Sequence, residues 1–336
     1  MALLLLGGAC APRRAIIDAP AVFMAPRAPL PRCSLASAIE SSLVARFDSH
    51  AVERVIASWR RMADGHVHDA ALPGVERDPM LRQQANSYLE GLPVQLFHDA
   101  AQYEWAHALE RHAAVVAEEF SAVLRAGDLE ERANNPWAGL ADIRDATTVA
   151  YGPEWRTLGL QDRGVWDEVN TRIFPKTTAL LHESGVPCVE AFFAKMPAGS
   201  KIQPHSDGCN FHLTCHLGVV VPEGECALKV GDEEREWRNG KVMLFDTSVM
   251  HSARNDAAVD RYVLMMRVWH PDLKPVEIDA LNWIFKCLDS PEILTAGVEQ
   301  TDRETHNTVV PTTGMSRAER RKAERKAAKA AKKRRA

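Results

Sequence analysis

Two histidines and one aspartate in the second half of the chain have the side-chain types that bind a divalent metal ion. His205 and Asp207 form an H-x-D step directly after Pro204, and His251 follows the apolar run KVMLFD and a short turn. Two imidazoles and one carboxylate on one side of a metal leave other coordination positions open, as in non-heme Fe(II) oxygenases. The sequence therefore predicts His205, Asp207 and His251 as the ligands of an iron site.

A second role stays open for each of these residues. Aspartate often caps a turn with its side chain, so Asp207 either binds the metal or only shapes the turn after the H-x-D step. His205 and His251 either bind the metal or are buried histidines with a structural role, because short motifs also arise by chance. The order of the two histidine segments and the strand-like runs beside them favour metal binding.

A cation on a later apolar run is suited to binding a carboxylate. Arg261 opens the run RYVLMMRV, where a charged side chain is expected to be buried and paired. A planar guanidinium makes two parallel hydrogen bonds to a carboxylate, so we expect Arg261 to hold a bound dicarboxylic acid. Arg267 has the same alternation along the run and is the competing candidate.

The run LTCHLGVVV supplies a further candidate. Along a strand, alternate side chains point to the same face, so His212, Thr214 and His216 share one face that is predicted to point inward. His216 is the candidate pocket residue, and His212 is the weaker one.

The elements that must position these residues change in type along the chain. Residues 40–148 carry a helical pattern, with apolar side chains every three or four residues between Trp105 and Val123 and Gly127 just past the predicted end. From residue 149 on, short strand-like runs alternate with Gly- and Pro-containing breaks. This alternation of short runs and breaks predicts an antiparallel sandwich or jelly roll. The fold class is therefore mainly β, with a jelly-roll core and an N-terminal helical region.

Four pieces of the chain, in order, resemble the aspartyl/asparaginyl β-hydroxylase family of 2-oxoglutarate oxygenases. They are PAGSKIQPHSD, HLGVVVPEG, WRNGKVMLFDTSVMHSARND and RYVLMMRVWHPDL, and the resemblance covers about residues 150–275. It implies a double-stranded β-helix fold, an Fe(II) cofactor, 2-oxoglutarate as co-substrate and hydroxylation of a substrate C–H bond with dioxygen. It also implies roles for single residues: His205 and His251 as iron ligands, Arg261 as anchor of the distal carboxylate, His216 near the co-substrate, and Asp246 as an acid beside the turn before His251.

Three positions of this chain depart from the animal hydroxylases of that family. Those hydroxylases have Gly where this chain has Asp207, so only here is a full triad of protein ligands available. They have a Ser and an Arg near 2-oxoglutarate where this chain has Ala194 and Thr214, so two hydrogen-bonding partners are missing. The repeat domain that accompanies the peptide hydroxylases is absent from this sequence as well.

Two classes of function are therefore compared. The first is an Fe(II)/2-oxoglutarate-dependent dioxygenase, whose substrate is an unidentified protein (peptidyl Asp/Asn-like) or small molecule. The second is a jelly-roll module that binds a metal without 2-oxoglutarate, or that is not catalytic at all. Arg261 discriminates between the two classes, because only the oxygenase needs it for co-substrate binding.

Composition excludes several other classes of protein. The chain has 336 residues, of which 46% are hydrophobic and 26% charged, values typical of a globular protein with a sizeable core. No run approaches the roughly 20 apolar residues that span a bilayer, so no transmembrane segment is predicted. The seven cysteines are scattered and contain no C-x-x-C pair, which argues against zinc ribbons and disulfide scaffolds.

Charge and composition divide the chain into four parts. Residues 1–39 are rich in Ala, Pro and Arg and predict a targeting presequence, for a plastid in preference to a mitochondrion; without such a presequence the protein would be cytoplasmic. Residues 40–148 are the helical region and 149–290 the jelly-roll domain. Residues 291–336 are predicted to be a disordered, basic tail.

The formal net charge of −4 combines segments of opposite sign. The last 21 residues carry +9 and residues 1–39 carry +3, which leaves −16 for the body between them. An acidic body does not hold nucleic acid phosphates, so no specific nucleic acid partner is predicted. The basic tail is interpreted as a solubilising segment, with a nuclear signal or an RNA- or membrane-surface arm as the alternative.

Overall fold

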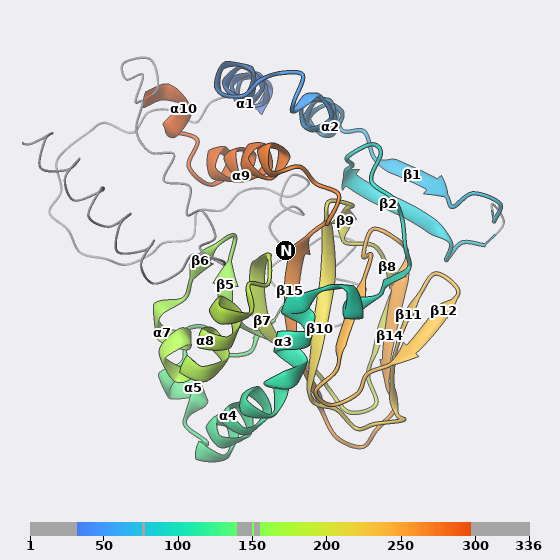
Figure 1. Cartoon of the computed structure of the whole chain (residues 1–336), viewed down its shortest axis with the longest axis vertical. Coiled ribbons are helices and arrows are strands. Elements are labelled where there is room, and N and C mark those ends of the chain that lie inside the picture. The colour runs from blue at the N-terminus through green and yellow to red at the C-terminus, as the bar shows by residue number, and fades with distance from the viewer. Residues whose placement is uncertain (1–31, 76–77, 140–149, 151–154, 297–336) are drawn as a thin grey trace, which may run out of the picture. The chain divides into compact units, whose positions relative to one another are not determined.

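The computed structural model describes residues 32–75, 78–139, 150 and 155–296 (Figure 1). The described residues up to Leu294 belong to one compact unit, and residues 295 and 296 belong to a second. Most of the predicted presequence and nearly all of the predicted basic tail lie outside the described residues. The four predicted domain boundaries therefore stay predictions.

The helices of the described residues occur in four groups along the chain. Their bounds are α1 (Arg32–Arg46), α2 (Glu53–Ala63), η2 (Ala100–Gln102), α3 (Glu104–Arg111), α4 (Ala113–Ala126), α5 (Leu129–Arg132), α7 (Glu168–Ile173), α8 (Pro175–Ser184), α9 (Pro275–Asp289) and α10 (Ile293–Ala296). Helix α4 ends where the sequence predicts, because Gly127 adopts the left-handed conformation with φ of 73°.

Most of the strands lie between α8 and α9. Their bounds are β1 (His68–Ala71), β2 (Arg82–Ser87), β3 (Phe97–His98), β4 (Ala138–Gly139), β5 (Arg156–Asp162), β6 (Val165–Trp166), β7 (Cys188–Met196), β8 (Lys201–His205), β9 (Gly208–Cys209), β10 (His212–Val220), β11 (Cys226–Val230), β12 (Glu233–Glu236), β13 (Val242–Phe245), β14 (His251–Asn255) and β15 (Arg261–Trp269).

Two antiparallel sheets form the core of the fold. The larger sheet has the order β3-β13-β10-β15-β7-β5-β4, with β6 paired to β5, and the smaller sheet has the order β12-β11-β14-β8. The non-sequential order, in which strands far apart in the chain become neighbours, is that of a jelly roll. The predicted mainly β, double-stranded β-helix core is thus confirmed.

Alternation along the strands gives the larger sheet two buried faces. On β10, Leu213, Cys215 and Leu217 point to the helices, whereas Thr214 and His216 point toward the smaller sheet. Strand β15 follows the same rule with Leu264, Met266 and Val268 on the helical side. Because both faces are covered, every residue of β10 from position 212 to 219 is buried, as are the residues of β15 from 263 to 268.

Helices α3, α4 and α8 cover the outer face of the larger sheet (Figure 1). Phe120 of α4 and Phe174 before α8 pack on Phe193 of β7, with ring centroids 4.6 and 4.8 Å from it. The carboxylate of Glu119 accepts hydrogen bonds from the first backbone amides of α8, which satisfies donors that a helix start leaves open. The back of the sheet is therefore a packed apolar layer.

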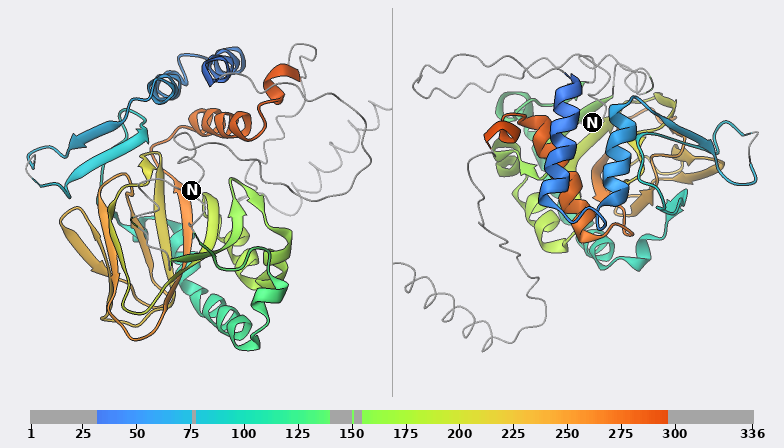
Figure 2. Two further views of the ribbon diagram at one scale, coloured as in Figure 1. Left: turned by 180° about the vertical axis from the view of Figure 1, so that it is seen from behind. Right: turned by 90° about the horizontal axis from the view of Figure 1, so that it is seen from above.

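A separate helical layer lies at one end of the two sheets. Figure 2 shows α1 and α2 beside α9, and their apolar side chains form a cluster of their own. Ile39, Val55 and Ile284 belong to it, together with Phe211 at the start of β10. Residues from both ends of the described chain thus close the fold at this end.

The region predicted to be helical also contains strands. Strands β1 to β4 lie within residues 40–148, and β3 and β4 extend the larger sheet. The β1–β2 hairpin projects from the body (Figure 1). Its strand β2 is anchored at the base by Gln84 N, which donates to Ser248 O at 2.8 Å, and by Met250 N, which donates to Arg82 O at 3.0 Å.

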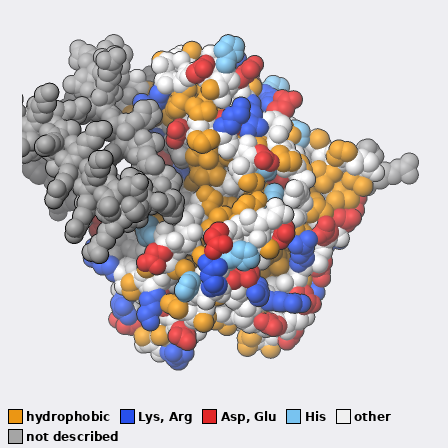
Figure 3. All heavy atoms as spheres, viewed as in Figure 1, with side chains coloured by type: hydrophobic (Ala, Val, Ile, Leu, Met, Phe, Trp, Pro, Cys, Tyr) orange, Lys and Arg blue, Asp and Glu red, His pale blue; other side chains and the backbone are white. Residues whose placement is uncertain are grey.

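Two observations bear on the surface. Within the described part of the chain, the helices lack the length and apolar composition that crossing a membrane requires. On the face seen in Figure 3, acidic and basic side chains of the described residues are interspersed.

The aromatic layer behind the larger sheet yields a stability prediction. Phe120 is fully buried, and Phe120→Ala removes its contacts with Phe193 and Tyr262. We expect the free energy of unfolding to fall by about 3–5 kcal/mol, measured by urea denaturation. Val165→Ala, at a position 72% exposed, is the matched control and should change it by less than about 0.5 kcal/mol. Equal effects of the two variants would contradict this packing.

Candidate active site

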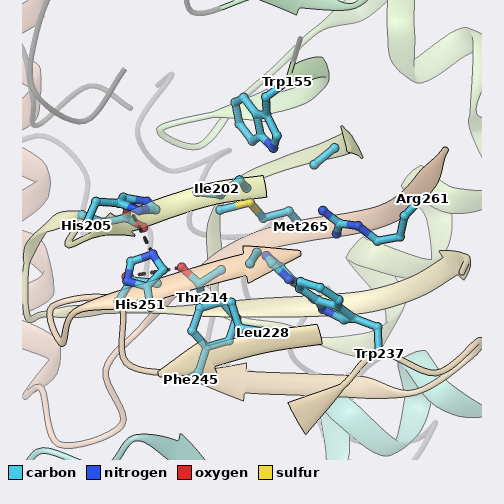
Figure 4. Close-up of a pocket in the computed structure, with 15 residues that line it drawn as sticks. Trp155, Ile202, His205, Thr214, Leu228, Trp237, Phe245, His251, Arg261 and Met265 are labelled. Carbon is cyan, nitrogen blue, oxygen red and sulfur yellow. Dashed lines mark hydrogen bonds and ion pairs between the residues drawn. The ribbon is translucent and has the colours of Figure 1, made fainter. Parts of the chain in front are cut away.

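A cavity lies between the two sheets, with polar groups at both ends (Figure 4). Its apolar walls come from the larger sheet on one side and the smaller sheet on the other. It is lined by Trp155, Ala194, Ile202, His205, Asp207, Thr214, His216, Leu228, Trp237, Phe245, Thr247, His251, Ala253, Arg261 and Met265. Figure 4 places His205 and His251 at one end and Arg261 with Trp237 at the other.

The first end is the cluster predicted from the sequence. His205 closes β8 and His251 opens β14, and the two residues face each other in the antiparallel register. Asp207 Oδ1 lies 3.6 Å from His205 Nε2 and 4.0 Å from His251 Nε2. One ligand atom from each residue lies within 4.8 Å of the others, so a single ion can contact all three.

Backbone carbonyls set the tautomer of both histidines. His205 Nδ1 lies 2.8 Å from Gln203 O, and His251 Nδ1 lies 2.9 Å from Val249 O. A carbonyl oxygen only accepts hydrogen bonds, so each Nδ1 carries the proton and donates it. The lone pair of each imidazole is therefore on Nε2, the atom that faces Asp207. Burial lowers the pKa of His251 to about 4, and the neighbouring His205 adds to this, so His251 is neutral at physiological pH, the form in which an imidazole can bind a metal.

Asp207 is ionised and held from two sides. Its Oδ2 forms an ion pair with Arg267 Nη2 at 2.8 Å, and its backbone amide donates to Thr247 O at 2.8 Å. Burial acts to raise the pKa of this carboxyl, but the positive charge of Arg267 and the nearby histidines outweigh it and hold the pKa below its usual value. Oδ1, the other carboxylate oxygen, is the one that faces the two imidazoles.

The turn before His251 is held by Asp246, the acid that the family resemblance placed there. Asp246 Oδ1 accepts from Ser248 N at 2.9 Å and from the Ser248 hydroxyl, which in turn accepts from Gln83 Nε2 at 2.8 Å. These contacts fix the turn from which Thr247 reaches Asp207. Asp246 thus acts on the site through the backbone, as partners of ligand-bearing segments commonly do.

The other end of the cavity holds a buried cation. Arg261 is 2% exposed, its guanidinium lies 4.4 Å above the ring of Trp237, and burial lowers its pKa to about 10. None of the described residues offers a hydrogen-bond acceptor to Nε or Nη1 of this side chain. A buried guanidinium needs an anionic partner, so this end of the cavity suits a carboxylate.

His216 is a neutral donor beside that cation. The indole Nε1 of Trp237 donates to His216 Nδ1 at 3.1 Å, so the imidazole proton is on Nε2. Burial and the charge of Arg261 lower the pKa of His216 well below its usual value. Nε2 is buried with no hydrogen-bond partner among the described residues, which leaves one N–H for a ligand.

The structure separates the remaining candidates. Thr214 and Ala194 line the cavity, so the two departures from the family pattern do lie at the site. His212 lies outside the cavity lining, where its ring packs 4.5 Å from that of Trp269. Arg267 points to the metal-ligand end and pairs with Asp207, so it does not compete with Arg261.

Sequence reasoning missed two residues. Trp237, in the stretch WRNGK, fixes the His216 tautomer and carries the Arg261 guanidinium on its ring. Glu190 of β7 lies opposite Arg267 of β15 in the register. Each of these two charges interrupts an otherwise apolar strand, VEAFFAKM or RYVLMMRV, and that coincidence is a signal for a buried ion pair.

The donor sets fit a divalent metal and a dicarboxylate. Two neutral imidazoles and one carboxylate are hard-to-borderline ligands of the kind that hold Fe(II) while leaving positions open. A metal at His205, Asp207 and His251 and an anion at Arg261 would lie at opposite ends of one cavity. A ligand that chelates the metal at one end and carries a carboxylate at the other matches this arrangement.

The buried Asp246 predicts a pH-dependent stability. Burial raises its pKa from 3.8 to about 6, against the hydrogen bonds from Ser248. Between pH 4 and 6 the unfolded state releases this proton first, so rising pH lowers the stability of the folded state. The wild type should therefore lose about 2–2.5 kcal/mol relative to Asp246→Asn from pH 4 to pH 7, measured by urea unfolding at each pH.

An exposed acid serves as the control for this comparison. Glu168→Gln, at a side chain 85% exposed, should show no comparable change of its difference from wild type across this pH range. The assignment would be contradicted if the stability of the wild type, measured relative to that of Asp246→Asn, stayed constant or rose from pH 4 to pH 7.

Comparisons with known proteins agree with these observations. Residues 110–271 match the model of the family described as Aspartyl/Asparaginyl beta-hydroxylase. Aspartyl/asparaginyl beta-hydroxylase of Mus musculus is 33% identical over 36% of this chain and 17% of its own length. Aspartate beta-hydroxylase domain-containing protein 2 of Homo sapiens is 34% identical over 39% of this chain and 38% of its own length.

A bacterial relative covers more of the chain. Ornithine lipid ester-linked acyl 2-hydroxylase of Rhizobium tropici is 29% identical over 55% of this chain and 64% of its own length. Among solved structures, a Cupin 2 conserved barrel domain protein from Salinispora arenicola is 12% identical and covers 40% of this chain and 87% of that chain, with a TM-score of 0.26. The chain spans less than half the length of the two animal relatives. Over the stretch from residue 110 to 271, just under half of this chain, the sequence matches the aspartyl/asparaginyl beta-hydroxylase family.

Proposed function

We propose that the protein is an Fe(II)- and 2-oxoglutarate-dependent dioxygenase that hydroxylates a substrate C–H bond. One observation carries the proposal: a single cavity has a His–Asp–His cluster at one end and, at the other, a buried guanidinium for which the described residues supply no anionic partner. The hydroxylases among the relatives support an enzyme of this reaction type.

The proposal assigns a role to each residue of the cavity. His205, Asp207 and His251 would hold Fe(II), and Arg261 would bind the far carboxylate of 2-oxoglutarate. His216 would donate its Nε2 proton in a hydrogen bond to the co-substrate, in the tautomer that Trp237 sets. Bound iron and 2-oxoglutarate would supply the oxidising chemistry, in which dioxygen converts the oxo acid to succinate and carbon dioxide and a substrate C–H to C–OH.

The rest of the cavity serves to exclude water. Ile202, Leu228, Phe245 and Met265 line it from both sheets, so a bound dicarboxylate lies in an apolar channel. In such a setting the ion pair at Arg261 is stronger than in water. The protein's contribution is therefore positioning and the exclusion of side reactions.

The substrate is proposed only by class. Among the relatives, one is an aspartyl/asparaginyl hydroxylase and another a hydroxylase of a lipid acyl chain. Either a peptidyl Asp- or Asn-like residue or a small molecule, lipids included, is proposed here. The alternative function, a metal-binding jelly roll that does not use 2-oxoglutarate, becomes an outcome of the test below.

Succinate formation tests the proposed function. The full chain, reconstituted with Fe(II), should convert 2-oxoglutarate to succinate once oxygen is admitted, even without the substrate. Full-chain His251→Ala, treated in the same way, should form at least about 100-fold less, since one metal ligand is lost. Succinate that does not depend on iron, oxygen and His251 contradicts the proposal. No succinate from a chain that does bind iron favours the metal-binding module.

The buried cation predicts opposite effects on stability and on binding. In Arg261→Met the desolvated charge is removed, so without 2-oxoglutarate the free energy of unfolding should rise by about 1–3 kcal/mol. The dissociation constant for 2-oxoglutarate should rise at least about 30-fold. Denaturant unfolding and calorimetric titration of the Fe(II)-loaded chain measure the two effects.

Arg238→Met is the matched control, because this arginine is exposed and directly follows Trp237, a residue of the cavity lining. It should leave both quantities unchanged. Unaltered 2-oxoglutarate binding in Arg261→Met would remove the main support for the oxygenase.

A further inference from the structure

Two acidic side chains and one arginine form a buried charge cluster behind the metal-ligand end of the cavity. Arg267 of β15 lies opposite Glu190 of β7 in the register, and all three residues of the set Glu190, Asp207 and Arg267 are buried. Arg267 Nη2 lies 2.8 Å from Asp207 Oδ2, and Arg267 Nε lies 3.8 Å from Glu190 Oε2. The guanidinium thus lies between two carboxylates.

The third nitrogen of this guanidinium is also occupied. Arg267 Nη1 donates to Thr247 Oγ1 at 3.3 Å, and Thr247 O accepts from the backbone amide of Asp207 at 2.8 Å. The side chain and the backbone of Asp207 are therefore tied to the same pair of residues. Because the guanidinium is planar and its donors are fixed in a fork, these contacts determine the direction of the carboxylate.

The two arginines of β15 thereby differ in what they face. The nitrogens of Arg267 point to protein groups, whereas Nε and Nη1 of Arg261 have no hydrogen-bond partner among the described residues. Arg261 is suited to binding a ligand reversibly, whereas Arg267 is suited to holding another side chain of the protein in place.

We infer that Arg267, with Glu190 as its counter-charge, is the positioning residue that makes Asp207 a metal ligand. Arg267 binds Oδ2 of the carboxylate and so leaves Oδ1 directed at His205 Nε2 and His251 Nε2, at 3.6 and 4.0 Å. Outer partners of this kind orient ligands and change metal affinity by about 10–100-fold. The inference rests on the proposed metal centre and is independent of the co-substrate.

Binding of Co(II) to the full chain, without 2-oxoglutarate, tests this inference. Co(II) is a visible probe for such a site, so its absorption spectrum and a titration report coordination and affinity together. Arg267→Met should lower Co(II) affinity about 10–100-fold and alter the absorption bands, because Asp207 loses its orientation. Arg238→Met, at an exposed arginine outside the cavity lining, is the control and should leave Co(II) affinity unchanged.

A double-mutant cycle separates positioning from a general structural effect. Asp207→Ala should lower Co(II) affinity, and adding Arg267→Met to Asp207→Ala should lower it no further. Equal losses from Arg267→Met in the presence and absence of Asp207 would overturn the inference. A wild-type-like or higher affinity of Arg267→Met would also overturn it, since Arg267 would then be neutral or compete with the metal.

Arg267→Lys keeps the inference testable if Arg267→Met does not fold. Lysine retains the charge beside Glu190 and Asp207 but lacks the fork, so we expect a smaller loss of Co(II) affinity that again disappears in the Asp207→Ala background. A loss that persists there overturns the inference. A wild-type chain that forms no succinate but shows this cycle refutes the oxygenase alone, whereas one that binds no Co(II) refutes the metal centre and the inference with it.

Discussion

The two-sided burial of the larger sheet is the constraint on which the site depends. Strand alternation assigns every second side chain of β10 and β15 to the helical layer and the others to the space between the sheets. Leu213, Cys215 and Leu217 pack against the helical layer, and Thr214 and His216 are left to make polar contacts in the space between the sheets. A shift of one residue in the register would exchange the two sets and bury the site's polar groups against Phe120 and Phe174.

Desolvation is the second feature that shapes the site. Arg261, His216 and His251 are all buried, and burial lowers the pKa of each, which favours the neutral form of the side chain. For the two histidines this is useful, because neutral imidazoles are needed as ligand and as donor. For Arg261 it is a cost in the ligand-free protein, which a carboxylate bound there, as proposed, would offset. Without a ligand, the folded protein is therefore less stable with Arg261 than it would be with an apolar side chain at the same position.

The parts of the molecule that follow from local patterns could be predicted from the sequence. The strand runs between residues 188 and 269, the end of α4 at Gly127 and the grouping of His205, Asp207 and His251 all follow from alternation, turn residues and motif order. What could not be predicted depends on pairing between distant segments. The Glu190–Arg267 contact requires the β7–β15 register, and the Trp237–His216 hydrogen bond requires the loop after β12 to close over β10. Strands β1 to β4 were missed because their short runs are weak signals beside the helical pattern around them.

The structure also relates two departures from the family pattern to each other. In the animal hydroxylases that the sequence resembles, an Arg occupies the position of Thr214 and a Gly that of Asp207. Here Arg267 is the direct partner of Thr214 across the β10–β15 register, and the hydroxyl of Thr247 contacts both, at 3.4 and 3.3 Å.

A small residue at Thr214 leaves room for the guanidinium of Arg267 to pass toward Asp207. A second guanidinium from β10 would lie against the first in a buried space, where like charges repel strongly. An acid at position 207 also requires a cation close by, because an unpaired carboxylate is costly to bury. Asp207, Thr214 and Arg267 thus form one interdependent set, in which β10 carries no arginine at position 214 and the neighbouring strand supplies Arg267, which pairs with the proposed metal ligand Asp207.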